Sequence, residues 1–116
     1  MISFSKVVWF VSLAIVTCFS LLPGSPEPPP LPHLDKVQHF LAYGWLAFVQ
    51  GCFLRSRFFA MAGFLVGWGV MLELLQGCIP HRFMSVADVV ANSAGVLGGL
   101  ILARYMVRRT GRSVAD

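Results

Sequence analysis

The chain has 116 residues, of which 57% are hydrophobic and 12% charged, and its formal net charge is +4. Soluble domains carry about 25% charged residues, so this composition and the mean hydropathy of +0.75 predict a small integral membrane protein. The basic residues flank apolar segments and do not line one face among aromatic side chains, which argues against nucleic-acid binding.

The first apolar segment comprises residues 1–22 and is interrupted by Lys6 and a few hydroxyl side chains. It is long enough to span, because about twenty residues cross the hydrocarbon core. No A-x-A-like cleavage site follows it, so we predict a retained membrane helix and not a secretory signal peptide. Residues 23–34 hold six of the seven prolines and predict an extended outer linker. A ligand for a proline-reading domain is the alternative.

Residues 35–103 contain three further apolar segments, and residues 104–116 form a basic tail. We predict spans at residues 35–54, at residues 58–79 and from residue 86 to the tail. The fold class predicted is therefore all-α, a bundle of four transmembrane helices with no soluble domain.

Helix ends and close-packing positions can also be predicted. Ser85 is a candidate N-cap for the fourth span. Gly63-x-x-x-Gly67 predicts a close contact between two helices, and Gly95 and Gly99 share a small-residue face of the fourth span. These faces leave room for self-association, so a homo-oligomer stays open.

The basic residues predict the orientation. If both termini lie in the cytoplasm, seven basic residues fall on that side and only Lys36 and Arg82 fall outside. The positive-inside rule therefore predicts cytoplasmic termini. The Pro-rich linker and the turn between the third and fourth spans then share the outer side.

Polar side chains collect at this outer end. The presence of charged residues within apolar segments requires an explanation, because a charge at the bilayer centre costs about 2.5–3.5 kcal/mol. We predict a polar pocket that opens outwards between the second, third and fourth spans. The candidate binding residues are Asp35, Lys36, His39, Tyr43, Glu73, Gln76, Arg82, Asp88 and Asn92.

Three sequence blocks at this end carry a resemblance. They read Asp35-Lys36-x-x-His39-Phe40-x-Ala42-Tyr43, then Glu73-x-x-Gln76, then Pro80-x-Arg82-Phe83-x-Ser85-x-x-Asp88-x-x-x-Asn92-x-x-Gly95. Together, over residues 35–99, they resemble the VanZ-like family of small bacterial membrane proteins. One departure is His81, where the family more often has glycine. The resemblance implies a multi-pass protein of the bacterial inner membrane, associated through its family with low-level resistance to the glycopeptide teicoplanin.

Three functions fit the polar residues. The pocket binds a lipid headgroup, a lipid-linked cell-wall precursor or a glycopeptide without chemistry, and this is the interpretation we favour. Alternatively, a membrane enzyme acts on a lipid-linked phosphate, with Glu73, His39 and Asp88 as candidate catalytic groups for acid–base or nucleophilic work. In the third interpretation, Glu73, Arg82, Asp88 and Asn92 pair with one another and only lock the helices.

A metal site is a further alternative. His39, Glu73, His81 and Asp88 are of types that bind Zn²⁺, but no pair has a diagnostic ligand spacing. The sequence alone therefore predicts no metal and no cofactor, and the expected partners are the bilayer and its headgroups.

Overall fold

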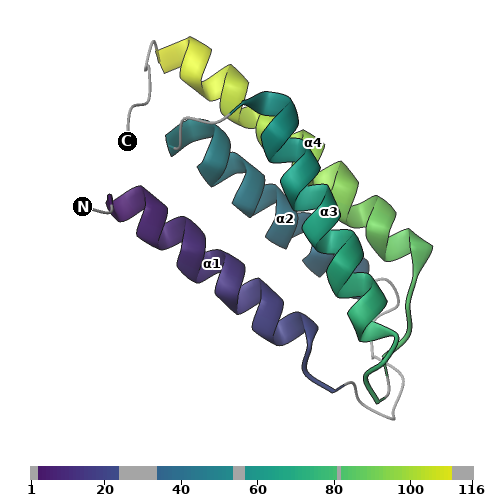
Figure 1. Ribbon diagram of the computed structural model, residues 1–116. Coiled ribbons are helices and arrows are strands. Elements are labelled where there is room, and N and C mark those ends of the chain that lie inside the picture. Colours follow the sequence, from purple (N-terminus) through teal and green to yellow (C-terminus); the bar gives the residue numbers. More distant parts are fainter. Residues whose placement is uncertain (1–2, 24–33, 54–56, 81, 111–116) are drawn as a thin grey trace.

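Four helices and no strand are found in the described residues of the computed structural model, which are 3–23, 34–53, 57–80 and 82–110. The helices are α1 (Phe4–Ser20), α2 (Leu34–Phe53), α3 (Phe58–Gln76) and α4 (Val86–Thr110) (Figure 1). The all-α prediction is confirmed. The helix ends agree with the predicted spans to within a few residues, except that α4 continues well into the predicted basic tail.

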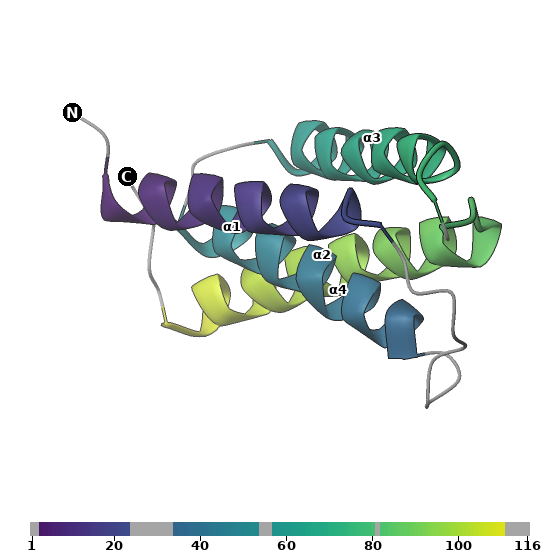
Figure 2. The same ribbon diagram turned by 90° about the horizontal axis from the view of Figure 1, so that it is seen from below.

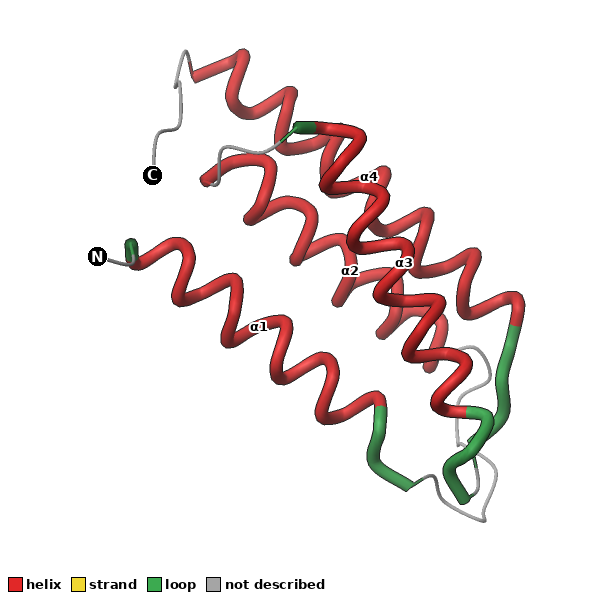
Figure 3. The backbone as a smooth tube through the Cα atoms, in the orientation of Figure 1, coloured by secondary structure: helices red, strands yellow, loops and turns green. Residues whose placement is uncertain are grey.

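Successive helices run in opposite directions. α1 begins, α2 ends, α3 begins and α4 ends at one end of the bundle (Figures 1 and 3). The opposite end, where α2 and α4 begin and α1 and α3 end, is called the polar end below. α2 and α4 make the most extensive contact, while α1 packs on α2 and α3 (Figure 2).

Glycine allows α2 and α4 to touch through their backbones. A Cβ atom at Gly95 would run into the carbonyl oxygen of Phe40, and one at Gly99 into that of Gly44. The small-residue face of α4 is therefore used inside the chain and is not free for self-association. Around Gly63, by contrast, a Cβ atom would meet nothing within 4 Å.

The close contact predicted at Gly63 and Gly67 is thus wrong for the single chain. A Cβ atom at Gly67 would also meet open space, since this face of α3 is turned away from the other helices. The spacing of the glycines is the same as in a packing motif, but the rotation of the helix about its axis decides whether a neighbour is there.

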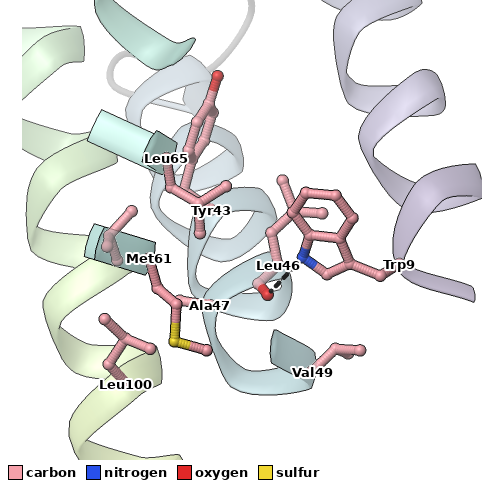
Figure 4. Close-up of a cluster of buried hydrophobic side chains, with 9 residues drawn as sticks. Trp9, Tyr43, Leu46, Ala47, Val49, Met61, Leu65 and Leu100 are labelled. Atoms are coloured by element: carbon pink, nitrogen blue, oxygen red, sulfur yellow. Dashed lines mark hydrogen bonds between the residues drawn. The ribbon is translucent and has the colours of Figure 1, made fainter. Parts of the chain in front are cut away.

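A cluster of apolar side chains fills the middle of the bundle (Figure 4). Its buried members are Trp9, Tyr43, Leu46, Ala47, Val49, Met61, Leu65, Val96 and Leu100. The Trp9 indole also donates a hydrogen bond of 3.2 Å to the carbonyl oxygen of Leu46, which ties α1 to α2 (Figure 4).

Two further tryptophans fasten α1 through its hydroxyl side chains. Trp45 Nε1 donates to Ser12 Oγ and Trp68 Nε1 to Thr17 Oγ1, each at 3.0 Å. The Trp68 bond is partly buried, where an indole N–H without an acceptor would cost about 1–3 kcal/mol, whereas the Trp45 bond is exposed. The two bonds connect α1 to α2 and to α3.

The outer surface of the bundle is rich in apolar side chains. The segments Phe59–Gln76 and Val86–Arg109 are long and apolar enough to cross a membrane, whereas α1 is apolar but shorter. Large apolar side chains such as Leu41, Val90 and Ile101 are each 61% exposed. Soluble monomers rarely expose large continuous apolar patches, so this surface favours a membrane protein.

Gly95→Ala is expected to lower the free energy of unfolding by about 1–3 kcal/mol, because the added methyl group forces α2 and α4 apart. Gly98→Ala is the matched control, since its Cβ would meet nothing nearer than Phe40 Cζ at 4.0 Å. That control should leave stability unchanged or raise it by up to about 1 kcal/mol. Unfolding in mixed detergent micelles, followed by circular dichroism, checks both, and equal losses would contradict the backbone contact.

Candidate functional site

Glu73 joins the end of α3 to the start of α4. It lies one turn before the end of α3 and is only 2% exposed. Its Oε1 accepts a hydrogen bond of 2.7 Å from the backbone N–H of Ser85. Ser85 Oγ in turn accepts from the N–H of Asp88 at 3.4 Å, so Ser85 caps α4 as the sequence predicts. The Glu73 carboxylate therefore stabilises the residue that starts the next helix.

His39 and Asn92 connect α2 to α4. The Nδ1 atom of His39 lies 2.9 Å from the side-chain oxygen of Asn92. Because an amide oxygen can only accept, Nδ1 must carry the hydrogen of this bond. The other ring nitrogen, Nε2, faces Asp88 Oδ2 at 3.9 Å. Asp88 and Asn92 are one turn apart on α4, so both present to the same histidine.

Lys36 completes this set of contacts. Its ammonium lies 3.5 Å from Asp88 Oδ1 and 3.7 Å from Asp35 Oδ2. The Asp88 side chain is 8% exposed, whereas that of Asp35 is 54% exposed. Asp88 also sits in the first turn of α4, where the helix dipole favours a negative charge. Lys36 thus pairs with one buried and one surface carboxylate.

These contacts define a polar cluster formed by Lys36, His39, Glu73, Asp88 and Asn92. It lies at the polar end and draws on α2, α3 and α4. Its members are among the residues that the sequence singles out, and the structure brings them together.

The remaining candidates lie around this cluster. Tyr43 is 1% exposed in the apolar core, and Asp35 lies at the surface. Gln76 Nε2 donates to the carbonyl oxygen of Ser20 at 2.8 Å. Gln76 therefore binds α1 and not the polar cluster.

Arg82 also binds α1. Its Nε donates to the carbonyl oxygen of Leu22 at 2.7 Å and its Nη2 to that of Phe19 at 3.1 Å. These carbonyl groups at the end of α1 lack partners within the helix, so a guanidinium group suits them. The expected pairing of Arg82 with Glu73 or Asp88 is not among its described hydrogen bonds and ion pairs. The hydroxyl side chains of α1 and the carbonyl groups at its end could have predicted these contacts from the sequence, had they been considered as hydrogen-bond acceptors.

A cavity of about 350 Å³ opens between α1, α2 and the end of α3. Its lining residues are Ile15, Val16, Phe19, Ser20, Gln38, His39, Ala42, Tyr43, Gln76 and Arg82. α1 supplies a mostly apolar wall, while the other elements supply most of the polar groups. The cavity meets the polar cluster at His39, which belongs to both.

This cavity differs from the predicted pocket between the second, third and fourth spans. Glu73, Asp88 and Asn92 fill that space, and none is more than 6% exposed. The open space lies on the side of α1, and residues of α1 replace those of α4 in the lining of the cavity.

Comparison with protein-family models, curated proteins and solved structures found no match to this chain. Inferences about function therefore rest on the residues of the polar cluster and the cavity.

Glu73→Ala is expected to lower the free energy of unfolding by about 2–4 kcal/mol, because it leaves a buried void and removes the acceptor of the Ser85 N–H. Glu73→Gln keeps an oxygen at the same place and should cost less than about 1 kcal/mol. Asp35→Asn, a change on an exposed side chain, serves as the neutral control. Unfolding in mixed micelles measures all three, and equal losses for both Glu73 variants would show that the hydrogen bond contributes nothing.

Proposed function

We propose that all four helices span the bacterial inner membrane, with both termini in the cytoplasm. Two helices have spans long and apolar enough by themselves. α1, at 17 residues, is about 26 Å long and α2 is about 30 Å, which is close to the hydrocarbon thickness of about 30 Å. The antiparallel order is consistent with four successive crossings.

The distribution of charge supports this orientation. The described basic residues at the end where α1 begins and α4 ends are Lys6, Arg57, Arg104, Arg108 and Arg109. The polar end has Lys36 and Arg82. By the positive-inside rule, the first of these ends faces the cytoplasm and the polar end faces outwards.

Membership of the VanZ-like family is part of the proposal. Its support is that residues from the three resembling blocks meet in one place, although they are far apart along the chain. His39 comes from the first block, Glu73 from the second, and Asp88 and Asn92 from the third. An association with teicoplanin resistance is proposed for this chain on the basis of this resemblance alone.

We further propose that the cavity binds the anionic headgroup of a phospholipid or of a lipid-linked cell-wall precursor at the outer leaflet. The observation that carries this proposal is the composition of the cavity, with an apolar wall from α1 facing Gln38, His39 and Arg82. An amphiphile requires such a pair of surfaces. Arg82 has five N–H donors and uses two in its described bonds to α1, so three remain for a phosphate.

The size of the cavity selects among ligands. Small-ligand pockets have volumes of roughly 300–1,000 Å³, and about 350 Å³ is at the lower end of this range. A headgroup fits such a volume, whereas a glycopeptide of the size of teicoplanin could not be enclosed in it. The headgroup is therefore the ligand that the geometry supports best.

Cysteine labelling tests the orientation. In a chain whose three native cysteines are replaced, Phe83→Cys, an 84% exposed position in the turn between α3 and α4, should react with a membrane-impermeant maleimide in intact spheroplasts. Arg109→Cys should react only after the cells are opened. The reverse pattern would overturn the proposed orientation. Equal reactivity of the two positions in intact spheroplasts would overturn the proposal that α4, which lies between them, crosses the membrane.

Arg82→Gln is expected to weaken binding of phosphatidylglycerol and of a polyprenyl phosphate at least tenfold, because it removes a charge-assisted contact worth about 1.5–3 kcal/mol. Arg109→Gln makes the same charge change at the other end of the bundle and should have little effect. Native mass spectrometry of the purified chain titrated with each lipid gives the affinities.

Circular dichroism must first show that Arg82→Gln is folded, since Arg82 also holds α1. If the folded variant binds both lipids as the wild type does, or if both arginine variants lose binding equally, the cavity is not the headgroup site. Preference for only one of the two lipids would identify the ligand.

A further inference from the structure

Three ligand-type side chains from three helices meet in the polar cluster. One donor atom each from His39, Glu73 and Asp88 lies within 4.8 Å of the other two. Glu73 and Asp88 are 2% and 6% exposed, and the His39 side chain is 15% exposed. An imidazole and two carboxylates are ligands that Zn²⁺ accepts in proteins.

The hydrogen bonding of His39 prepares it for a metal ion. Asn92 accepts the hydrogen of Nδ1, which leaves Nε2 as the nitrogen that faces Asp88. Histidine ligands of metal ions commonly donate their second N–H in this way, which fixes the tautomer and the ring orientation. Asn92 is thus placed to act as a positioning residue.

The space between His39 and Asp88 suits an ion better than a direct hydrogen bond. Nε2 and Oδ2 are 3.9 Å apart, which is too long for such a bond. The other oxygen of Asp88, Oδ1, is buried and accepts no hydrogen bond from the described residues. The Lys36 ammonium lies 3.5 Å from Oδ1 as an ion pair without hydrogen-bond geometry.

The distances are close to those of a coordinated ion. Ligand atoms of a tetrahedral Zn²⁺ are roughly 3.3 Å apart, given bond lengths of about 2.0–2.1 Å. The donors of His39, Glu73 and Asp88 would need to approach one another by roughly 1.5 Å at most, which side-chain rotation can supply.

We propose that His39, Glu73 and Asp88 form a binding site for Zn²⁺ or a similar divalent transition-metal ion. Support for this site does not depend on the proposed headgroup binding. Three protein ligands leave a fourth coordination position open, and His39 is shared with the cavity, so the open position is reached from there. The sequence-based prediction of no metal rested on spacing, which is uninformative when each ligand comes from a different helix.

The contact of Lys36 with Asp88 predicts the direction in which one substitution changes the metal affinity. Without an ion, its ammonium offsets part of the negative charge of Asp88. A bound cation must displace Lys36, whose side chain is 34% exposed and can move into solvent. Removing this competing charge by Lys36→Gln should therefore strengthen metal binding, whereas a purely structural ion pair predicts no such gain.

Titration of the metal-stripped, full-length chain in detergent with Zn²⁺ tests the site. We expect one ion per chain, measured by calorimetry and by elemental analysis. Glu73→Gln, Asp88→Asn and His39→Gln should each weaken binding at least tenfold. Arg109→Gln, which changes the charge at the other end of the bundle and removes no ligand, should change the affinity less than twofold. Lys36→Gln should bind roughly fivefold tighter, since a partly exposed ion pair is lost.

Stoichiometric binding that survives all three ligand substitutions would overturn the proposal, as would the absence of stoichiometric binding in the wild type. Glu73→Gln is the most informative variant, because it keeps the oxygen that accepts the Ser85 N–H.

X-ray absorption at the zinc edge needs no variant of the three ligands. The other two histidines, His33 and His81, lie outside the described residues, so both are replaced by glutamine for this measurement. The spectrum should show one imidazole with oxygen ligands and no sulfur. A first shell that contains sulfur, or that lacks imidazole, would assign the ion to another place and refute the site.

Discussion

The backbone contact between α2 and α4 determines the position of most polar groups at the polar end. Glycine at positions 44, 95 and 99 lets the backbones of the two helices come into contact, because a Cβ atom at each of these positions would meet the backbone of the other helix. The first turns of both helices are then adjacent, so Lys36 and His39 face Asp88 and Asn92. Wider separation would leave the buried carboxylate of Asp88 without the neighbouring Lys36 ammonium.

The polar cluster leaves one buried oxygen atom without a hydrogen bond from the described residues, Oδ1 of Asp88. A lock that only holds helices together is expected to satisfy every buried polar group, because an unpaired one costs more than its contacts return. Two parts meet this expectation, the bond from Ser85 N–H to Glu73 and the bond between His39 and Asn92. Asp88 does not, since its Oδ1 accepts no hydrogen bond from the described residues and its Oδ2 is 3.9 Å from the imidazole. The proposed binding of an ion by His39, Glu73 and Asp88 would use these free positions of Asp88.

Local features could be predicted from the sequence, whereas the choice of partners could not. The four helices and the Ser85 cap follow from hydrophobicity and helix-end chemistry, which depend on neighbouring residues. Charge asymmetry together with helical spacing was enough to group His39 with Asp88. Gly63 and Gly95 have the same kind of spacing but opposite environments, because helix rotation is set by contacts distant in sequence. For the same reason, the interpretation that pairs Arg82 with Glu73 and Asp88 did not anticipate its contact with the end of α1.

The role of α1 follows from that last contact. α1 lies outside the segment that resembles the VanZ-like family, yet it supplies the apolar wall of the cavity. It is fastened by indole hydrogen bonds along its length, and at its end by Gln76 and Arg82, which themselves line the cavity. A headgroup that takes up the free donors of Arg82 therefore acts on the same guanidinium that holds Phe19 and Leu22. If the cavity binds a headgroup as proposed, its occupancy and the position of α1 are coupled, because Arg82 contacts both.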